Sequence, residues 1–289
     1  MPEDDGSRNP FRLDPAKLQD ELDEALEEYD DEGDVDPAFY RHGGVSLSDS
    51  EREALGDLQG KRLLMVQAGN GEDVLSLKNL GAVVTCVDDE ESLEGARALA
   101  EAAGAAIEFV EDDPSSLSDE LRRGQFDVAY SGFSSLVWLP SLDDWASGIA
   151  AALKRGGRLV IYDEHPIARM FGQMNGHLFV SNSYFGETVE WEDDEAEDDE
   201  ESSEDQEAAT EHDLALLEED FPGGPILPGP EWTLGDVIDA LGANGLAVVS
   251  FKEFPESDRY ETSLDTLVDV EYDEVSRVPG AMLIIAVKL

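Results

Sequence analysis

The stretch that decides the fold is Leu63-Leu-Met-Val-Gln-Ala-Gly-Asn-Gly-Glu-Asp73. It begins as a continuous apolar run, passes through two glycines and continues directly into residues with helical spacing. An uninterrupted apolar run is typical of a strand buried on both faces of a parallel sheet. Glycines at such a turn let a ligand approach the backbone, and the free N–H groups of a helix start attract an anion. The stretch therefore predicts a strand and a ligand-binding turn.

The same rhythm of strand, turn and helix continues on the C-terminal side of this stretch. Further strands are predicted at 83–87, 107–110, 126–130, 158–162, 246–251 and 282–287, and helices at 71–80, 90–103, 142–153 and 233–243. Gly156-Gly157 is expected to stop the third of these helices. Strands separated by single helices are connected by right-handed crossovers. The pattern predicts an α/β fold with a doubly wound sheet.

Two segments fall outside this rhythm. Residues 1–59 are predicted to be an N-terminal helical extension, with one helix opening at Asp14-Pro15 and another capped by Ser48 and Glu51. The main domain is expected at 60–289, with an acidic insertion at about 187–220 that contains no lysine or arginine. A short strand or hairpin is expected between residues 177 and 184.

The charge balance is extreme. The chain has 69 Asp and Glu residues against 19 Lys and Arg, a net charge of -50, while its hydrophobic fraction of 41% excludes wholesale disorder. Acids stud ordinary helix surfaces, which favours a halophilic adaptation to molar salt over an acidic tail for polycations. Nucleic acid is disfavoured as a partner, because counterion release drives little phosphate binding at such salt.

Location and metal chemistry are bounded by simple counts. No apolar run is long enough to span a membrane, and the acidic N-terminus lacks the apolar core of a secretory signal, so a cytoplasmic protein is expected. Cys86 is the only cysteine, which excludes an intramolecular disulfide and a cysteine-based zinc site. No metal site is predicted.

An acid at the end of the second strand points to a cofactor. Asp88 lies 17 residues beyond Gly71, where a carboxylate can accept both hydroxyls of a ribose. Together with the glycine turn and Asp112-Asp113 after the third strand, it indicates an adenosine-containing cofactor. A dinucleotide is disfavoured because Val74 stands where the third glycine of the fingerprint belongs, and no Gly-Lys-Ser/Thr loop is present. The remaining common choice is S-adenosylmethionine.

From about Lys61 to Leu289, the chain resembles the class I S-adenosylmethionine-dependent methyltransferases. The resemblance is carried by 67–73, 80–88, 126–130, 153–158 and 162–166, and is strongest to a small-molecule-type subgroup with Gln at the first motif position and Val137-Trp-Leu-Pro140 after the fourth strand. It implies a Rossmann-like, doubly wound sheet of seven mostly parallel strands with an antiparallel last strand. It also implies methyl transfer, and a small-molecule acceptor as partner.

The resemblance implies roles for matching positions. Gln67, Gly69, Asn70 and Gly71 would line the methionine part of the cofactor, Asp88 would hold the ribose and Asp89 would flank it. Asp112 or Asp113 would accept the adenine amino group, and Ser131 would lie beneath the sulfonium. The family usually has an acid or another polar residue, which positions the cofactor's ammonium, where this chain has Met65. Pro114 lacks the N–H expected for an adenine nitrogen, and Asp112 with the Asp113 N–H is the expected substitute.

Candidate catalytic residues follow the fifth strand. Glu164 and His165 lie where ligands bind in such sheets, and either is a candidate general base if the acceptor loses a proton. The alternative for His165 is that it caps a local turn. Tyr130 and Trp138 are either acceptor-pocket walls or core residues. Two other functions remain open: a non-catalytic S-adenosylmethionine-binding regulatory protein, and an RNA or protein methyltransferase.

Overall fold

The computed structural model describes residues 35–174, 177–185, 232–257, 259–260, 262–264 and 277–289. The helix expected from Asp14 and the acidic insertion at 187–220 lie outside the described residues. Within the described part of the chain, no helix is both long and apolar enough to cross a membrane.

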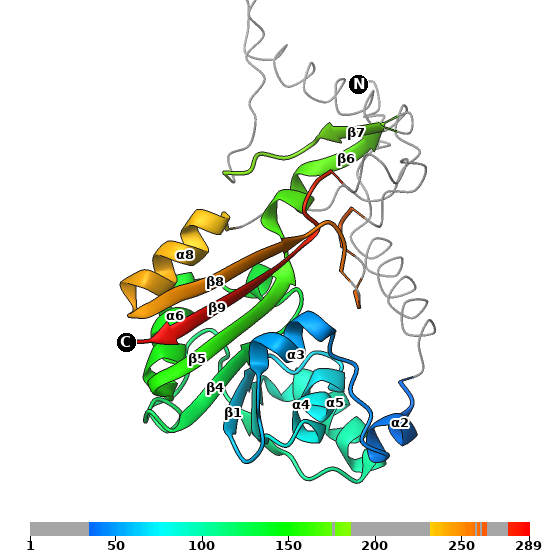
Figure 1. Cartoon of the computed structure of the whole chain (residues 1–289), viewed down its shortest axis with the longest axis vertical. Helices are drawn as coiled ribbons and strands as arrows, with labels where there is room; N and C mark the ends of the chain where they lie inside the picture. Colours follow the sequence, from blue (N-terminus) through cyan, green and yellow to red (C-terminus); the bar gives the residue numbers. More distant parts are fainter. Residues whose placement is uncertain (1–34, 175–176, 186–231, 258, 261, 265–276) are drawn as a thin grey trace, which may run out of the picture.

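A seven-stranded sheet forms the centre of the molecule, in the order β3-β2-β1-β4-β5-β9-β8 (Figure 1). The strands are β1 (Arg62–Val66), β2 (Val83–Asp88), β3 (Glu108–Glu111), β4 (Phe126–Ser131), β5 (Leu153–Glu164), β8 (Leu246–Phe254) and β9 (Ala281–Lys288). The first five pair in parallel, while β9 is antiparallel to both of its neighbours, β5 and β8. The predicted α/β fold, with its doubly wound and mostly parallel sheet and antiparallel last strand, is confirmed.

Helices cover both faces of the sheet (Figure 1). They are α2 (Pro37–Arg41), α3 (Asp49–Leu55), α4 (Glu72–Asn79), α5 (Glu90–Ala103), α6 (Leu142–Ala152) and α8 (Leu234–Ala243), with 3-10 turns η1 (Leu136–Trp138) and η2 (Pro166–Met170). Successive residues of β1 alternate between two cores. Leu64 and Val66 pack with residues of α6 and α8, whereas Leu63 and Met65 pack with residues of α3, α4 and α5. The apolar run of β1 is therefore buried on both faces, as predicted.

The described part of the N-terminal extension packs against the sheet and shares its hydrophobic core. Ser48 caps α3 and forms the predicted capping box with Glu51. Leu47, Leu55 and Leu58 belong to the core that packs on β1. The helix ends at Leu55 rather than near Leu58, because Gly56 leaves the helical conformation with φ of 63°. Residues 47–58 thus share one core with the sheet.

The structure also defines the end of α6 and the hairpin expected after β5. Helix α6 ends at Ala152, before Gly156, because Leu153 already pairs with Phe126 as the start of β5. The segment after β5 forms a hairpin of β6 (Phe171–Met174) and β7 (His177–Val180), separate from the main sheet.

The order of the strands fixes where a ligand binds. Strand β1 lies between β2 and β4, so the chain winds outward from β1 in both directions. Ligands of such sheets bind outside the carboxyl ends of the strands at this switch point.

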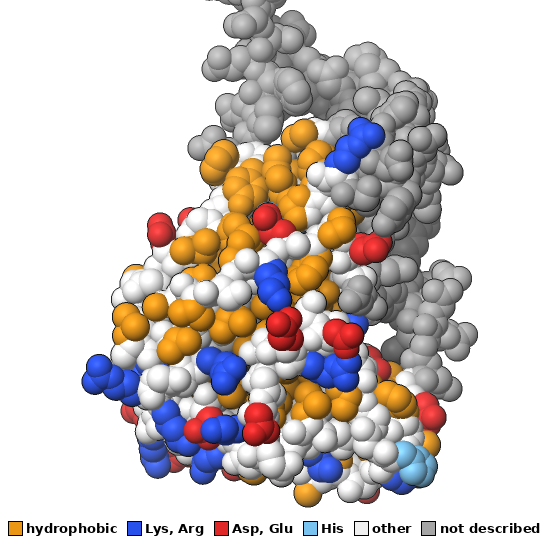
Figure 2. All heavy atoms as spheres, viewed as in Figure 1, with side chains coloured by type: hydrophobic (Ala, Val, Ile, Leu, Met, Phe, Trp, Pro, Cys, Tyr) orange, Lys and Arg blue, Asp and Glu red, His pale blue; other side chains and the backbone are white. Residues whose placement is uncertain are grey.

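Figure 2 shows Lys and Arg side chains gathered on the lower part of the viewed face, where Figure 1 places the opposite ends of β1, β4 and β5. The basic residues Arg62, Lys154, Arg158 and Lys288 stand at this opposite edge.

Candidate active site

A cleft of about 1160 Å³ opens at the carboxyl ends of β1, β2, β3 and β4. Its walls come from the loops that follow these four strands, together with Tyr260 from the segment after β8. The lining residues are Met65, Gln67, Ala68, Gly69, Asn70, Asp73, Asp88, Asp89, Ser92, Glu111, Asp112, Asp113, Pro114, Ser115, Gly132, Phe133, Ser134, Ser135, Trp138, Leu139, Pro140 and Tyr260. Six of them carry a carboxylate, and none of these lining residues is a lysine or arginine.

The turn after β1 lines the cleft and contains a buried polar atom of Gln67. Gln67 has a left-handed backbone conformation with φ of 69°, which a non-glycine residue rarely adopts. Its Oε1 is buried and accepts no hydrogen bond from the described residues. Such an atom costs free energy unless a ligand or water satisfies it. Gly69 has φ of 51°, and a Cβ there would meet no protein atom within 4 Å.

Asp88 ends β2 and faces the cleft with both oxygens already engaged by the backbone. Its Oδ2 accepts the N–H of Ala68 at 2.7 Å, and its Oδ1 accepts the N–H of Asp89 at 3.0 Å. Burial raises the pKa of this carboxyl above its usual value, and the two N–H donors act in the opposite direction. Each carboxylate oxygen has a further lone pair for a ligand hydroxyl. Asp89 caps α5 by accepting the N–H of Ser92 at 2.8 Å.

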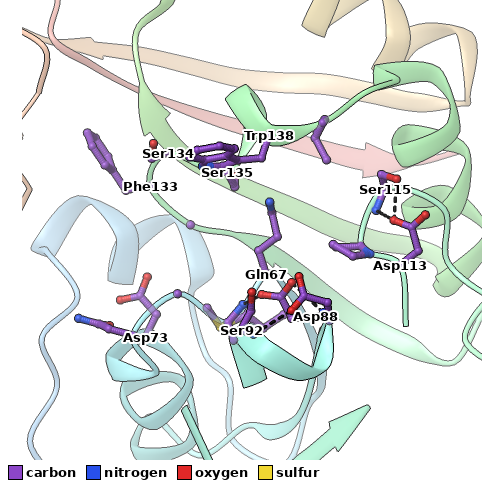
Figure 3. A pocket seen from close by; sticks show the side chains of 18 of the residues that line it. Gln67, Asp73, Asp88, Ser92, Asp113, Ser115, Phe133, Ser134, Ser135 and Trp138 are labelled. Atoms are coloured by element: carbon purple, nitrogen blue, oxygen red, sulfur yellow. Dashed lines mark hydrogen bonds between the residues drawn. The ribbon is translucent and has the colours of Figure 1, made fainter. Parts of the chain in front are cut away.

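The loop after β3 forms the far end of the cleft (Figure 3). Asp113 Oδ1 accepts the N–H of Ser115 at 2.8 Å and its hydroxyl at 2.6 Å. The Asp113 N–H donates to Asp112 Oδ1 at 2.9 Å. This N–H is therefore engaged within the loop and would have to leave Asp112 to bind an adenine nitrogen, so the pairing of Asp112 with the Asp113 N–H as an adenine site stays a prediction.

Two of the predicted cofactor residues do not line the cleft. A Cβ at Gly71 would lie 2.8 Å from Ala96 Cα, so this glycine permits close packing of α4 on α5. Ser131 is fully buried, and its hydroxyl is 2.6 Å from that of Ser135. Gln67, Gly69, Asn70, Asp88, Asp89, Asp112 and Asp113 do line it.

Neither predicted general base reaches the large cleft. Glu164 is buried, pairs with Arg169 at 2.8 Å and accepts the N–H of Ser263. It lines a second cavity of about 40 Å³ with Asp163 and Trp232. Chain order placed Glu164 at the correct sheet edge, but its side chain is held by the neighbouring segments.

His165 caps a local turn, which was the structural alternative. Its Nδ1 accepts the N–H of Ile167 at 3.2 Å at the start of η2. Its Nε2 lies 3.2 Å from Glu253 Oε1, but this contact lacks hydrogen-bond geometry. Burial lowers the pKa of the imidazole despite the nearby carboxylate. A neutral ring suits the accepting role of Nδ1.

Several cleft residues had no distinctive signal in the sequence. Ser134 and Ser135 line the wall after β4, and Ser134 has an unusual φ of 62°. Asp163, at the end of β5, fixes this loop by accepting the N–H groups of Ser134 at 2.6 Å and Leu136 at 2.9 Å. Burial raises the pKa of Asp163 to about 7. The motif around residues 162–166 contained Asp163, but nothing local indicated which of its acids would turn inward.

The two aromatic candidates have different positions. Tyr130 is fully buried, and its hydroxyl donates to Glu51 at 2.6 Å. Trp138 lines the cleft with 76% of its surface exposed. Phe133 also lines the cleft and stacks on Tyr260, with ring centroids 4.8 Å apart.

Within the described residues, no group of three or more His, Cys, Asp or Glu side chains is arranged to hold a metal ion.

Residues 63–157 match the model of a family described as a methyltransferase domain. Residues 63–157 thus form a methyltransferase domain, whose co-substrate is S-adenosylmethionine. The resemblance seen in the sequence motifs is thereby confirmed. A search of curated proteins finds no significant match.

The methyltransferase fold recurs in solved structures at low sequence identity. An S-adenosylmethionine-dependent methyltransferase from Mesorhizobium loti has a TM-score of 0.56 at 22% identity, over 83% of this chain and 96% of that one. A structure described as an S-adenosylmethionine-dependent methyltransferase from Listeria monocytogenes has a TM-score of 0.54 at 20% identity, over 83% and 96%. A geranyl diphosphate methyltransferase in complex with S-adenosylmethionine has a TM-score of 0.50 at 14% identity, over 97% and 93%.

The residues of the methyltransferase cleft fit its co-substrate. S-adenosylmethionine carries a sulfonium and an ammonium, and the six carboxylates give the cleft a potential that favours cations. The orphan Oε1 of Gln67 supplies a hydrogen-bond acceptor, and Asp88 supplies free lone pairs at the end of β2. These carboxylates and hydrogen-bond acceptors are therefore chemically suited to binding a cationic nucleoside.

Proposed function

We propose that this methyltransferase transfers the methyl group of S-adenosylmethionine to a small-molecule acceptor within the cleft. The observation that carries the proposal is one continuous cleft, lined at one end by Asp113 and Ser115, in the middle by Gln67 and Asp88, and at the other end by Phe133 (Figure 3). An adenosine cofactor and an acceptor can lie end to end in such a space.

Different residues of the cleft contact different parts of the co-substrate. Asp88 accepts the ribose hydroxyls, Asp89 flanks them and an acid of the β3 loop accepts the adenine amino group. Gln67, Gly69 and Asn70 contact the methionine part. When bound, the co-substrate supplies an electrophilic methyl group on its sulfonium. The chain's contribution is to hold the acceptor atom in line with that methyl group and to exclude water, because orientation supplies much of the rate enhancement.

The charge of the cleft supports a small, non-phosphorylated acceptor over nucleic acid. Phosphate-rich acceptors are bound by lysine, arginine or helix N-termini. No residue in the described lining is basic, and the sequence of 186–231 and of 265–276 contains no lysine or arginine either. Phe133, Trp138 and Tyr260 offer apolar faces instead. The geranyl diphosphate in the name of one structural neighbour carries a diphosphate, which this acidic lining would repel.

A non-catalytic cofactor-binding protein is the second candidate. It is favoured by the position of Glu164 and His165, which are both engaged outside the large cleft. This arrangement does not exclude transfer, because a base is needed only when the acceptor loses a proton during the reaction.

The test has two stages. Calorimetry in molar potassium chloride should show binding of S-adenosylhomocysteine and no comparable binding of NAD. Radiolabelled S-adenosylmethionine is then incubated with the protein and a cell extract separated into metabolite, RNA and protein fractions. Label in the metabolite fraction supports the proposal. Label in RNA or protein contradicts the small-molecule acceptor, and tight binding without transfer to any fraction favours the non-catalytic candidate.

A further inference from the structure

A buried charged cluster joins three distant segments at one end of the cleft. Arg259, which follows β8, contacts Glu51 of α3 at 2.7 Å and also pairs with Asp73 of α4. Their side chains are only 8%, 0% and 7% exposed, respectively. Two carboxylates thus face one guanidinium, so the cluster has one negative charge that no cation within it balances.

The other groups in the cluster are neutral hydroxyls. Tyr130 donates to Glu51 at 2.6 Å and approaches Asp73 Oδ2 at 3.3 Å, while Tyr260 donates to Asp73 Oδ1 at 3.1 Å. Burial raises the pKa of both phenols, so they remain protonated donors. Buried charges are normally paired, because hydroxyl donors solvate a carboxylate without neutralising it.

The unbalanced charge is accessible only on the cleft side. Glu51 is completely buried, whereas Asp73 lines the cleft. Among the hydrogen bonds of the described residues, Asp73 Oδ2 takes part in the long contact to Tyr130 alone, and the shorter bond of that tyrosine goes to Glu51. This oxygen faces Gly132, where an added Cβ would lie 3.1 Å away. A ligand in the cleft can therefore reach the oxygen with the most free bonding capacity.

Asp73 also lies at the end of the cleft where the amino-acid part of the cofactor is expected. Figure 3 shows Asp73 and Phe133 at the end opposite Asp113 and Ser115, with Gln67 and Asp88 between them. If the β3 loop takes the adenine and Asp88 the ribose, the methionine part extends toward Asp73. That part carries an ammonium group, which is the counter-charge that the cluster lacks.

We propose that Asp73, held in place by Arg259 and Tyr260, binds the ammonium group of S-adenosylmethionine, with Gln67 Oε1 as a second acceptor. The proposal rests on the proposed function. In this proposal Asp73, which reaches the cleft from α4, takes the role expected of a polar residue on β1 at the position of Met65. Met65 pairs in register with Tyr130, the residue whose hydroxyl approaches Asp73.

The test compares two ligands that differ only in this ammonium. They are S-adenosylhomocysteine and 5′-(3-carboxypropylthio)-5′-deoxyadenosine, which keeps the carboxylate and lacks the amino group. Calorimetry on the full chain in molar potassium chloride should show wild type binding S-adenosylhomocysteine at least tenfold more tightly. Asp73→Asn should lose at least tenfold affinity for S-adenosylhomocysteine and less than twofold for the deaminated ligand.

Glu51→Gln is the matched control, because it removes the other carboxylate of the same cluster from a position that the cleft does not reach. Because it removes the excess negative charge of the cluster but keeps the Asp73 oxygen that the cleft reaches, it should weaken S-adenosylhomocysteine binding less than Asp73→Asn does. Equal losses for both ligands in Asp73→Asn, or equal effects of the two variants, would overturn the proposal and make Asp73 a structural residue. Similar affinity of wild type for both ligands overturns it without any variant. If wild type binds neither ligand, the proposed function itself fails, and this proposal with it.

Discussion

Asp88 Oδ2 accepts the backbone N–H of Ala68 at 2.7 Å, which ties the end of β2 to the turn that follows β1. The carboxylate that is proposed to hold the ribose thus also fixes the loop that carries Gln67 and Gly69. Ligand binding and loop geometry at this point depend on the same side chain.

Asp88→Ala should lower affinity for S-adenosylhomocysteine at least tenfold, because hydrogen bonds to a charged group contribute about 1.5–3 kcal/mol each. Glu94→Gln removes a charge from the exposed face of α5 and should leave binding unchanged. Calorimetry of both variants checks this, with circular dichroism as the folding control. Unchanged affinity in a folded Asp88→Ala variant would remove Asp88 from the site.

The two glycines of the turn should separate stability from affinity. Gly71→Ala places a methyl group 2.8 Å from Ala96 Cα in a left-handed conformation, so it should cost stability through both overpacking and strain, each roughly 1–3 kcal/mol. A methyl group in Gly69→Ala would meet no protein atom within 4 Å, so this variant carries the strain alone, but the methyl group is added to a residue that lines the cleft. Denaturant unfolding and calorimetry should show Gly71→Ala as the less stable variant and Gly69→Ala as the weaker binder.

Adding Ala96→Gly to Gly71→Ala should restore part of the lost stability, because it removes the Cβ that lies 3.1 Å from the introduced methyl group. Absence of any recovery would show that the loss comes from the remaining contact with Ala96 Cα and from backbone strain, and not from the Ala96 methyl group.

Asp163 should make stability depend on pH around neutrality. Its folded-state pKa is raised to about 7 from 3.8, so the folded protein binds more protons than the unfolded chain between these values. The contribution of Asp163 is therefore fully present below the unfolded pKa and is lost as pH rises through about 7. Asp163→Asn cannot titrate and leaves the Leu136 N–H facing an amide. It should be most destabilising at acidic pH and less so above neutrality.

Unfolding free energies of wild type and Asp163→Asn, measured across this pH range in molar potassium chloride, check that sign. A difference that grows with pH would mean that the folded-state pKa is depressed by the N–H donors rather than raised by burial.

His165 should be replaceable by a residue that keeps its capping bond. Asparagine can accept the Ile167 N–H, so His165→Asn should fold like wild type, while His165→Ala should lose about 1 kcal/mol with the cap. Because the imidazole does not line the cleft, both should retain turnover with the acceptor identified from the extract. A large fall in kcat for His165→Asn, with cofactor binding intact, would restore His165 as a catalytic candidate.

Salt should stabilise the whole molecule. The charges behind a net charge of -50 repel one another over a Debye length of about 30 Å at roughly 0.01 M salt, but of only about 3 Å at molar salt. The thermal midpoint should therefore rise steeply as potassium chloride is added. An osmolyte without charge, at equal osmolality, controls for solvent exclusion. A midpoint that rises equally in the osmolyte would count against charge screening as the cause.

Local patterns in the sequence were sufficient for the fold. The apolar run at 63–66, the capping box of Ser48 and Glu51 and the acid at Asp88 each depend on residues that are close in the chain. Hydrophobic periodicity and capping act over a few residues, so strands, helices and the ligand edge of the sheet could be predicted from them. Element ends were less predictable, as at Ala152, because pairing with a distant strand decided where α6 stopped.

The chemistry of the cleft beyond the motif residues was decided by tertiary structure. Arg259 pairs with Asp73 across 186 residues of sequence, and Tyr130 with Glu51 across 79. No local pattern relates such residues, because their proximity follows from the order of the strands and the packing of α3 against β5. Glu164 is held partly in the same way, by the N–H of Ser263, which is 99 residues away. Its other partner, Arg169, is five residues away, and the Ile167 N–H that holds His165 is two residues away, so these contacts are local. Sequence periodicity fixes which edge binds the ligand, whereas the direction of side chains such as those of Asp73 and Glu164 there depends on long-range packing and hydrogen bonds.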